Sequence, residues 1–270
     1  MSTTGWSQSA TARRPESIAL TGRPGVPFRR LVKVELRKLT DTRAGRWLLI
    51  AILALTPLII AIMLITAAPQ DLTYEKLINF TQTPQKILLP ILGILTITSE
   101  WSQRTGLVTF TLAPQRGRVL LAKASATGIL GLVVIALAFG AAAVGNLLAV
   151  ALRNGNGSWA FGAGGFRDIT IVQLTGLAQG LAFGMLLLSS AAAIAAYYLL
   201  PNLSSFLVNV VPALKEGKEW FDLNSAQSAL YTHEMTGHAW VQLLVAVLIW
   251  VILPLALGVI RVLRSEISSS

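Results

Sequence analysis

The chain has 270 residues, of which 54% are hydrophobic, 13% are charged and none is cysteine. Soluble domains carry roughly 25% charged residues. Here the charges cluster between long apolar runs, so a soluble globular fold is excluded because too little polar surface would cover those runs. The absence of cysteine excludes disulfide frameworks, thiolate metal sites and cysteine nucleophiles. The net charge of +10 requires no nucleic acid partner, because no platform of interleaved aromatic and basic residues is present.

The first 46 residues divide into two parts. Residues 1–27 are rich in Ser, Thr, Arg, Pro and Gly and have almost no apolar period, which predicts a disordered tail. Residues 28–46 place an apolar stripe on one helical face, formed by Phe28, Leu31, Val32, Leu36 and Leu39. We expect an amphipathic helix at the membrane interface, its basic side chains reaching anionic head groups. A solvated helix packed on a partner protein is the alternative.

The apolar runs that follow predict an all-α polytopic membrane protein with about six spans inside a transmembrane domain of residues 47–264. The expected limits are about 47–66, 86–100, 120–152, 169–198, 201–214 and 240–260. The first run has 20 uncharged residues, about 30 Å as a helix, and starts too late for a cleavable secretory signal. The fifth is short, and Pro201 and Asn202 are the expected break before it.

Three glycines recur every four residues in the fourth predicted span: Gly176, Gly180 and Gly184. Small residues at this spacing lie on one helical face and allow another helix to approach closely. That second helix belongs either to the same subunit or to another, and the same subunit is favoured.

The charges predict an orientation. If six spans place both termini on one side, that side holds 16 basic and 5 acidic residues, and the opposite side holds 6 and 7. Basic residues stay in the cytoplasm during insertion, so both termini are expected there. This division leaves no ionisable residue other than histidine deep inside a span.

The segment between the second and third spans, SEWSQRTGLVTFTLAPQRGRVLLAK at 99–123, has the most informative pattern. Glu100 and Arg104 are four residues apart, a spacing that allows an ion pair on a helix. An apolar group follows, Leu107, Val108, Phe110 and Leu112, before Pro114 ends the element. A short cytoplasmic helix with an exposed apolar face predicts docking onto another protein. An ordinary basic loop is the alternative.

This segment resembles the permease subunits of type-2 ABC exporters, through Glu100, Arg104, Gly106, Leu112, Pro114, Arg116 or Arg118, and Lys123. The preceding RRLVKVELRKLTDTR is similar to the family's amphipathic elbow helix. The resemblance implies a coupling loop at 101–115 that binds an ATP-binding cassette subunit, with Trp101, Leu107 and Phe110 also in the contact. It further implies a second permease, the same chain or a related one, a re-entrant segment at 203–238 before the last span, and a bacterial inner-membrane location.

The sequence contains few motifs that could bind a cofactor or a metal ion or carry out catalysis. No G-x-x-x-x-G-K-[ST] phosphate loop is present, so ATP and Mg²⁺ are expected on the partner subunit and no cofactor on this chain. His233, Glu234 and His238 read H-E-x-x-x-H, and histidines five apart lie about 140° apart on a helix and cannot share a metal. We therefore expect no catalytic or metal site. A non-transporting membrane scaffold or immunity-type subunit is the alternative function, and the apolar spans favour a hydrophobic or amphipathic cargo.

Overall fold

The structure is a computed structural model that describes residues 26–102 and 116–264, and every described element is helical. The predicted tail and most of the predicted coupling loop lie outside this part of the chain. The elements are α1 (Phe28–Asp41), α2 (Arg43–Thr66), the 3₁₀ turn η1 (Pro69–Asp71), α3 (Tyr74–Ser102), α5 (Arg116–Arg153), α6 (Gly162–Leu187), α7 (Ser190–Val210), α8 (Pro212–Lys215), α9 (Lys218–Phe221), α10 (Leu223–Ala226), α11 (Ser228–Tyr231), α12 (Gly237–Val247), the π-helical turn η2 (Leu248–Ile252) and α13 (Leu253–Arg264).

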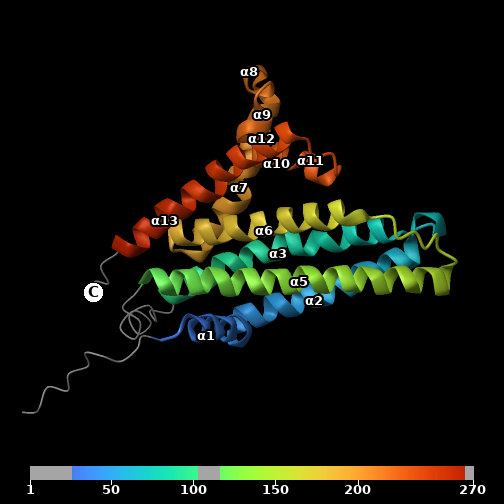
Figure 1. Cartoon of the computed structure of the whole chain (residues 1–270), viewed down its shortest axis with the longest axis horizontal. Helices are drawn as coiled ribbons and strands as arrows, with labels where there is room; N and C mark the ends of the chain where they lie inside the picture. The colour runs from blue at the N-terminus through green and yellow to red at the C-terminus, as the bar shows by residue number, and fades with distance from the viewer. Residues whose placement is uncertain (1–25, 103–115, 265–270) are drawn as a thin grey trace, which may run out of the picture.

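Among the described residues, five helices are long and apolar enough to cross a membrane: α2, α5, α6, α7 and the continuous run of α12, η2 and α13. Leucine, isoleucine and valine side chains remain exposed along α2 and α5, as expected for surfaces that face lipid. The chain is therefore a polytopic helical membrane protein. The second expected span, 86–100, corresponds to α3, which is too polar to join this group although it runs beside α2, α5 and α6 (Figure 1).

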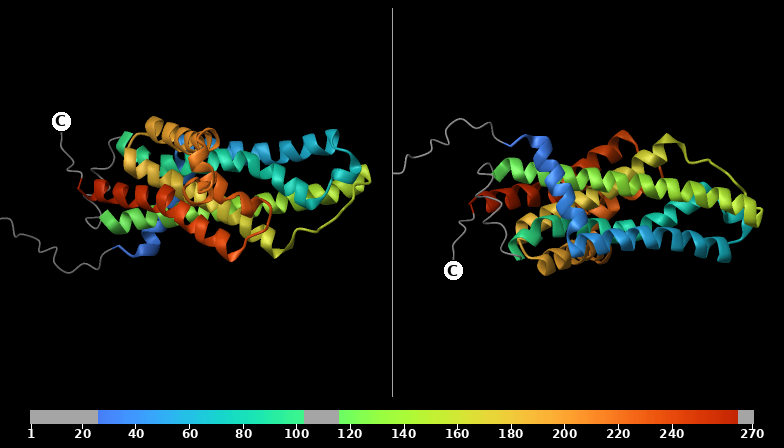
Figure 2. Two further views of the ribbon diagram at one scale, coloured as in Figure 1. Left: turned by 90° about the horizontal axis from the view of Figure 1, so that it is seen from above. Right: turned by 90° about the horizontal axis from the view of Figure 1, so that it is seen from below.

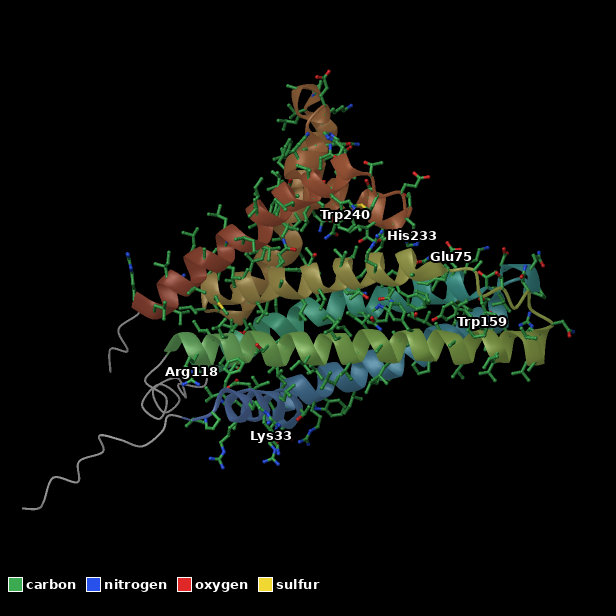
Figure 3. All side chains as sticks on the ribbon, in the orientation of Figure 1. Lys33, Glu75, Arg118, Trp159, His233 and Trp240 are labelled. Carbon is green, nitrogen blue, oxygen red and sulfur yellow. The ribbon has the colours of Figure 1, made fainter. Side chains whose placement is uncertain are left out.

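Helices α2, α3, α5 and α6 form a bundle, and α7 and α12 diverge from it toward the short helices α8–α11 (Figures 1 and 2). Helix α1 with the start of α2, the end of α3, the start of α5 and the end of α13 gather at one end, which we call the basic end. These segments carry Arg29, Arg30, Lys33, Arg37, Arg43, Arg46, Arg118, Arg261 and Arg264. Lys33 and Arg118 mark it in Figure 3. The opposite end, marked there by Glu75 and Trp159, is the far end.

A sharp corner places α1 across α2 and α5. Thr42 lies between α1 and α2 in an extended conformation, and its hydroxyl accepts a hydrogen bond from the Gly45 amide at 3.3 Å, which caps α2. A Cβ at Gly45 would lie 2.1 Å from the Leu39 carbonyl oxygen. Only glycine therefore allows the two helices to approach this closely.

Two boundaries differ from those that the sequence predicts. The break after the fourth span lies at Leu188, whose left-handed conformation (φ 54°) ends α6, and not at Pro201 and Asn202, which are inside α7. Helix α3 begins at Tyr74 and not near Lys86, because its polar side chains turn into the bundle and do not end the helix. Lys86 therefore lies near the middle of a 29-residue helix.

Candidate functional site

A buried ion pair joins α1 to α5 at the basic end. The Lys123 ammonium donates to Glu35 Oε2 at 2.6 Å, and the two side chains are 2% and 6% exposed. Lys38 donates to the other carboxylate oxygen, Oε1, at 2.8 Å. Removing one partner of a buried pair strands the other charge in a low-dielectric environment. This pair therefore fixes the position of α1 on the bundle.

A cavity of about 620 Å³ lies beside this pair, between α1, α2, α3 and the start of α7. Hydroxyl groups connect the helices around it. Thr127 on α5 donates to Thr96 on α3 at 3.3 Å, and the Thr98 and Ser190 hydroxyls lie 2.7 Å apart across α3 and α7. The last turns of α3 are thus bonded to both α5 and α7.

Most of the residues predicted to contact an ATPase lie outside the part of the chain that the structure describes. Glu100 and Trp101 belong to the last turn of α3 and Arg116 starts α5, whereas Arg104, Gly106, Leu107, Phe110, Leu112 and Pro114 fall outside the described residues. Arg118 donates to the Val26 carbonyl at 3.4 Å. Lys123 differs from the expected exposed contact residue: it is enclosed by the bundle and bound to Glu35. Its ammonium group therefore joins α5 to α1 within the chain.

The three glycines of α6 face α3 of the same chain. A Cβ at Gly180 would lie 2.3 Å from the Pro90 carbonyl oxygen, and one at Gly184 would lie 3.1 Å from the Ile94 carbonyl oxygen. At Gly176 the nearest atom would be the Tyr197 hydroxyl, at 3.1 Å. These three glycines therefore allow the backbones of α3 and α6 to come together within one subunit.

A polar seam runs along the same α3–α6 contact toward the far end. Gln173 on α6 donates to the side-chain oxygen of Gln82 on α3 at 2.6 Å, with both residues buried. The Gln82 and Gln179 amide nitrogens and both polar atoms of Gln85 are buried without a partner among the described residues. Buried polar groups are normally satisfied by protein, water or ligand. These amides therefore have room for further hydrogen bonds, to water or to a ligand.

The seam opens into a second cavity, of about 200 Å³, between α3, α6, α7, α10 and α11. Its one basic residue is Lys86, whose ammonium lies 4.2 Å from the centre of the Tyr231 ring. No Asp or Glu is among the residues that line it, which are Lys86, Pro90, Val172, Gln173, Gly176, Gln179, Tyr197, Tyr198, Pro201, Asn202, Leu223, Asn224, Gln227 and Tyr231. We call this space the Lys86 cavity.

A third charged group ties the start of α6 to the segment before α12. Asp168 is fully buried; its Oδ1 accepts from Arg167 Nε at 2.8 Å, and His233 Nδ1 lies 3.0 Å from its Oδ2. The Arg167 guanidinium carbon, Cζ, also lies 5.2 Å from the centre of the Trp240 ring. Figure 3 shows His233 and Trp240 beside α6. His238, by contrast, packs edge to face on Trp220, so the two histidines of the H-E-x-x-x-H pattern have separate surroundings.

Several of these sites have no signal in local sequence patterns. Glu35 and Lys123 are 88 residues apart, and Asp168 and His233 are 65 apart. Among the described residues, no group of three or more His, Asp or Glu side chains is placed to hold a metal ion.

No protein-family model matches this sequence, and comparison with curated proteins found no match. The resemblance to exporter permeases therefore rests on the residues quoted above.

Proposed function

We propose that this chain is the membrane-spanning permease subunit of an ATP-binding-cassette exporter in a bacterial cytoplasmic membrane. It would pair with a second permease and with two ATP-binding subunits, which hold the ATP and Mg²⁺. The observation that carries the proposal is the pattern of residues 99–123, which joins α3 to α5 where the positive charge is concentrated. An acidic residue, an arginine and an apolar group in such a connection are suited to docking in a groove of a partner protein.

The contacts at the basic end support a route for force. A push on residues 103–115 would act first on the end of α3 and the start of α5. The glycine contact at Pro90 joins α3 to α6, and the Glu35–Lys123 pair joins α5 to α1. These helices would then move as a unit, since packed interfaces shift as rigid elements. A pathway between the two permeases would open toward the outside.

The charge distribution supports the orientation. Nine arginine and lysine residues define the basic end, whereas the far end carries Asp71, Glu75 and Asp168 beside Lys76, Arg153 and Arg167. Under the positive-inside rule the basic end, and with it both termini, would lie in the cytoplasm. The segment 103–115 would then be on the side where ATP is available.

Purification in mild detergent from the native host tests this proposal, because an ATP-binding subunit is expected to co-purify with the chain. The double variant Glu100→Ala with Arg104→Ala should insert normally but lose export and partner retention by about tenfold or more, since charged contacts at an interface each contribute a few kcal/mol. Lys215→Ala with Glu216→Ala, an exposed charge pair on the segment before α12, is the matched control and should leave both unchanged.

Reconstitution separates the exporter from a membrane scaffold. Vesicles containing the chain and its co-purified ATPase should export an amphipathic cargo only when ATP is supplied. Absence of an ATP-binding partner, or unchanged export in the Glu100 and Arg104 variant, would overturn the proposal.

A further inference from the structure

The Lys86 cavity combines a positive charge with an apolar setting. Lys86 lies near the middle of α3, which runs within a bundle whose outer faces are leucine and isoleucine. Lys86 itself is exposed in the isolated chain while it also lines the cavity. The ring of Tyr231 provides a cation–π contact but no opposite charge.

The other polar groups of the cavity are suited to the same kind of ligand. Gln179 is 3% exposed and its amide nitrogen has no partner among the described residues, so it is a hydrogen-bond donor without an acceptor. Desolvation raises the pKa of Tyr231, so its hydroxyl keeps its proton and remains a donor at every physiological pH. A site with one cation, one buried donor without a partner and no carboxylate favours anions, because an anion satisfies the ammonium and the amide together.

The size of the space limits the ligand. About 200 Å³ is smaller than the roughly 300–1,000 Å³ of pockets that enclose drug-sized molecules. It is large enough for a phosphate or a carboxylate with a short substituent. The cavity therefore fits the charged head of a molecule, and a longer apolar part would lie outside along α3 and α7.

We propose that the Lys86 cavity is a binding site for a phosphate or carboxylate group, held by the Lys86 ammonium and the Gln179 amide. The group comes either from a small anion in solution or from the head group of an anionic lipid. The site lies within one subunit and needs no ATP-binding partner, so its test is independent of the exporter proposal.

Thermal unfolding of the purified full chain, followed by tryptophan fluorescence, tests the site with two probes. The first is inorganic phosphate, titrated against chloride at equal ionic strength in a neutral detergent. The second is phosphatidylglycerol against phosphatidylcholine in nanodiscs, with native mass spectrometry to detect retained lipid. A ligand that binds only the folded chain stabilises it by RT ln(1 + [L]/Kd), so the unfolding temperature rises as the ligand concentration is raised above Kd.

Variants identify the residues responsible. Lys86→Gln should weaken the apparent affinity by at least about tenfold, Gln179→Leu by about threefold to tenfold, and Lys86→Arg should retain binding because the charge is kept. Lys76→Gln is the matched control, since Lys76 lies on the same helix but pairs with Asp71 outside the cavity. A cooperative thermal unfolding transition of each variant in chloride alone shows that the variant folds.

Each outcome decides the proposal. Phosphate stabilisation that is lost in Lys86→Gln and kept in Lys76→Gln supports a small anion, and the same pattern with phosphatidylglycerol alone supports a lipid head group. If neither probe stabilises or remains bound to the unmodified chain, or if Lys86→Gln and Lys86→Arg behave like the unmodified chain and Gln179→Leu has no effect, the proposal is wrong.

Discussion

Two lysines on the helices of the bundle have opposite surroundings. Lys123 on α5 is 2% exposed and bound to the Glu35 carboxylate at 2.6 Å, whereas Lys86 on α3 lies in a cavity whose lining contains no carboxylate. The first charge is neutralised by the fold itself, and its loss would be felt as lost stability. The Lys86 charge has no carboxylate in the cavity lining to neutralise it, so a bound anion is expected to do so. The contrast teaches that a charge enclosed and paired within the fold marks structure, whereas a charge that borders a cavity without carboxylates is available for binding.

The comparison is tested most strongly at Lys123. Lys123→Met should lower the free energy of unfolding by about 3 kcal/mol, because Glu35 would remain buried with Lys38 as a partner on one oxygen only. Adding Glu35→Gln should restore most of this loss, since no buried charge is then stranded. Equilibrium unfolding in mixed micelles measures both. Lys38→Met, which removes a lysine that is 40% exposed, should cost below about 1 kcal/mol.

The glycine contact is expected to be the next most sensitive. Gly180→Ala should destabilise by about 1–3 kcal/mol, because its methyl group would lie 2.3 Å from the Pro90 carbonyl oxygen and force α3 and α6 apart. Gly140→Ala on α5 is the control, since no atom lies within 4 Å of its Cβ position, and it should be neutral or slightly stabilising. Equal effects of the two alanines on unfolding would contradict the α3–α6 contact.

A smaller effect is expected at the far end. Asp168→Asn keeps the shape of a fully buried side chain but weakens its bonds to Arg167 and His233, which should cost about 1–2 kcal/mol. Asp71→Asn removes a carboxylate that is 50% exposed and paired with Lys76, so it should change stability by below about 0.5 kcal/mol. The difference in unfolding midpoint between the two variants checks that the Asp168 group ties α6 to the segment before α12.

The smallest stability effect is predicted at Lys86. Lys86→Gln should change the free energy of unfolding by no more than about 0.5 kcal/mol in the absence of added anions, because no protein carboxylate loses its partner. A loss as large as that of Lys123→Met would show that Lys86 is a structural charge. The two-lysine comparison would then be wrong.

The all-α membrane fold could be predicted from the sequence because apolar runs of membrane length carry their own signal, as in α2 and α5. The α6–α7 break could not, since Leu188 and Ser189 are not helix breakers by type and Pro201 is accommodated inside α7. The length of α3 was also hidden, because Gln82, Gln85 and Lys86 read as a polar loop when their neighbours on α6 are unknown.

The candidate sites divide in the same way. The α6 glycines are spaced at four residues and could be identified from that spacing alone. The Glu35–Lys123 pair and the Lys86 cavity depend on helices distant in sequence, and periodicity carries no information about which helices become neighbours. Long-range charge pairing is therefore the part of the site that required the structure.

The central claim is that residues 103–115 lie in the cytoplasm, where an ATP-binding subunit can reach them. The chain contains no cysteine, so Gln103→Cys provides a single thiol for a membrane-impermeant maleimide, with Asn156→Cys in the loop before α6 as its counterpart. The account predicts that in intact cells the reagent labels residue 156 and not residue 103, and that residue 103 is labelled once the membrane is opened. Labelling of residue 103 from outside intact cells would contradict it.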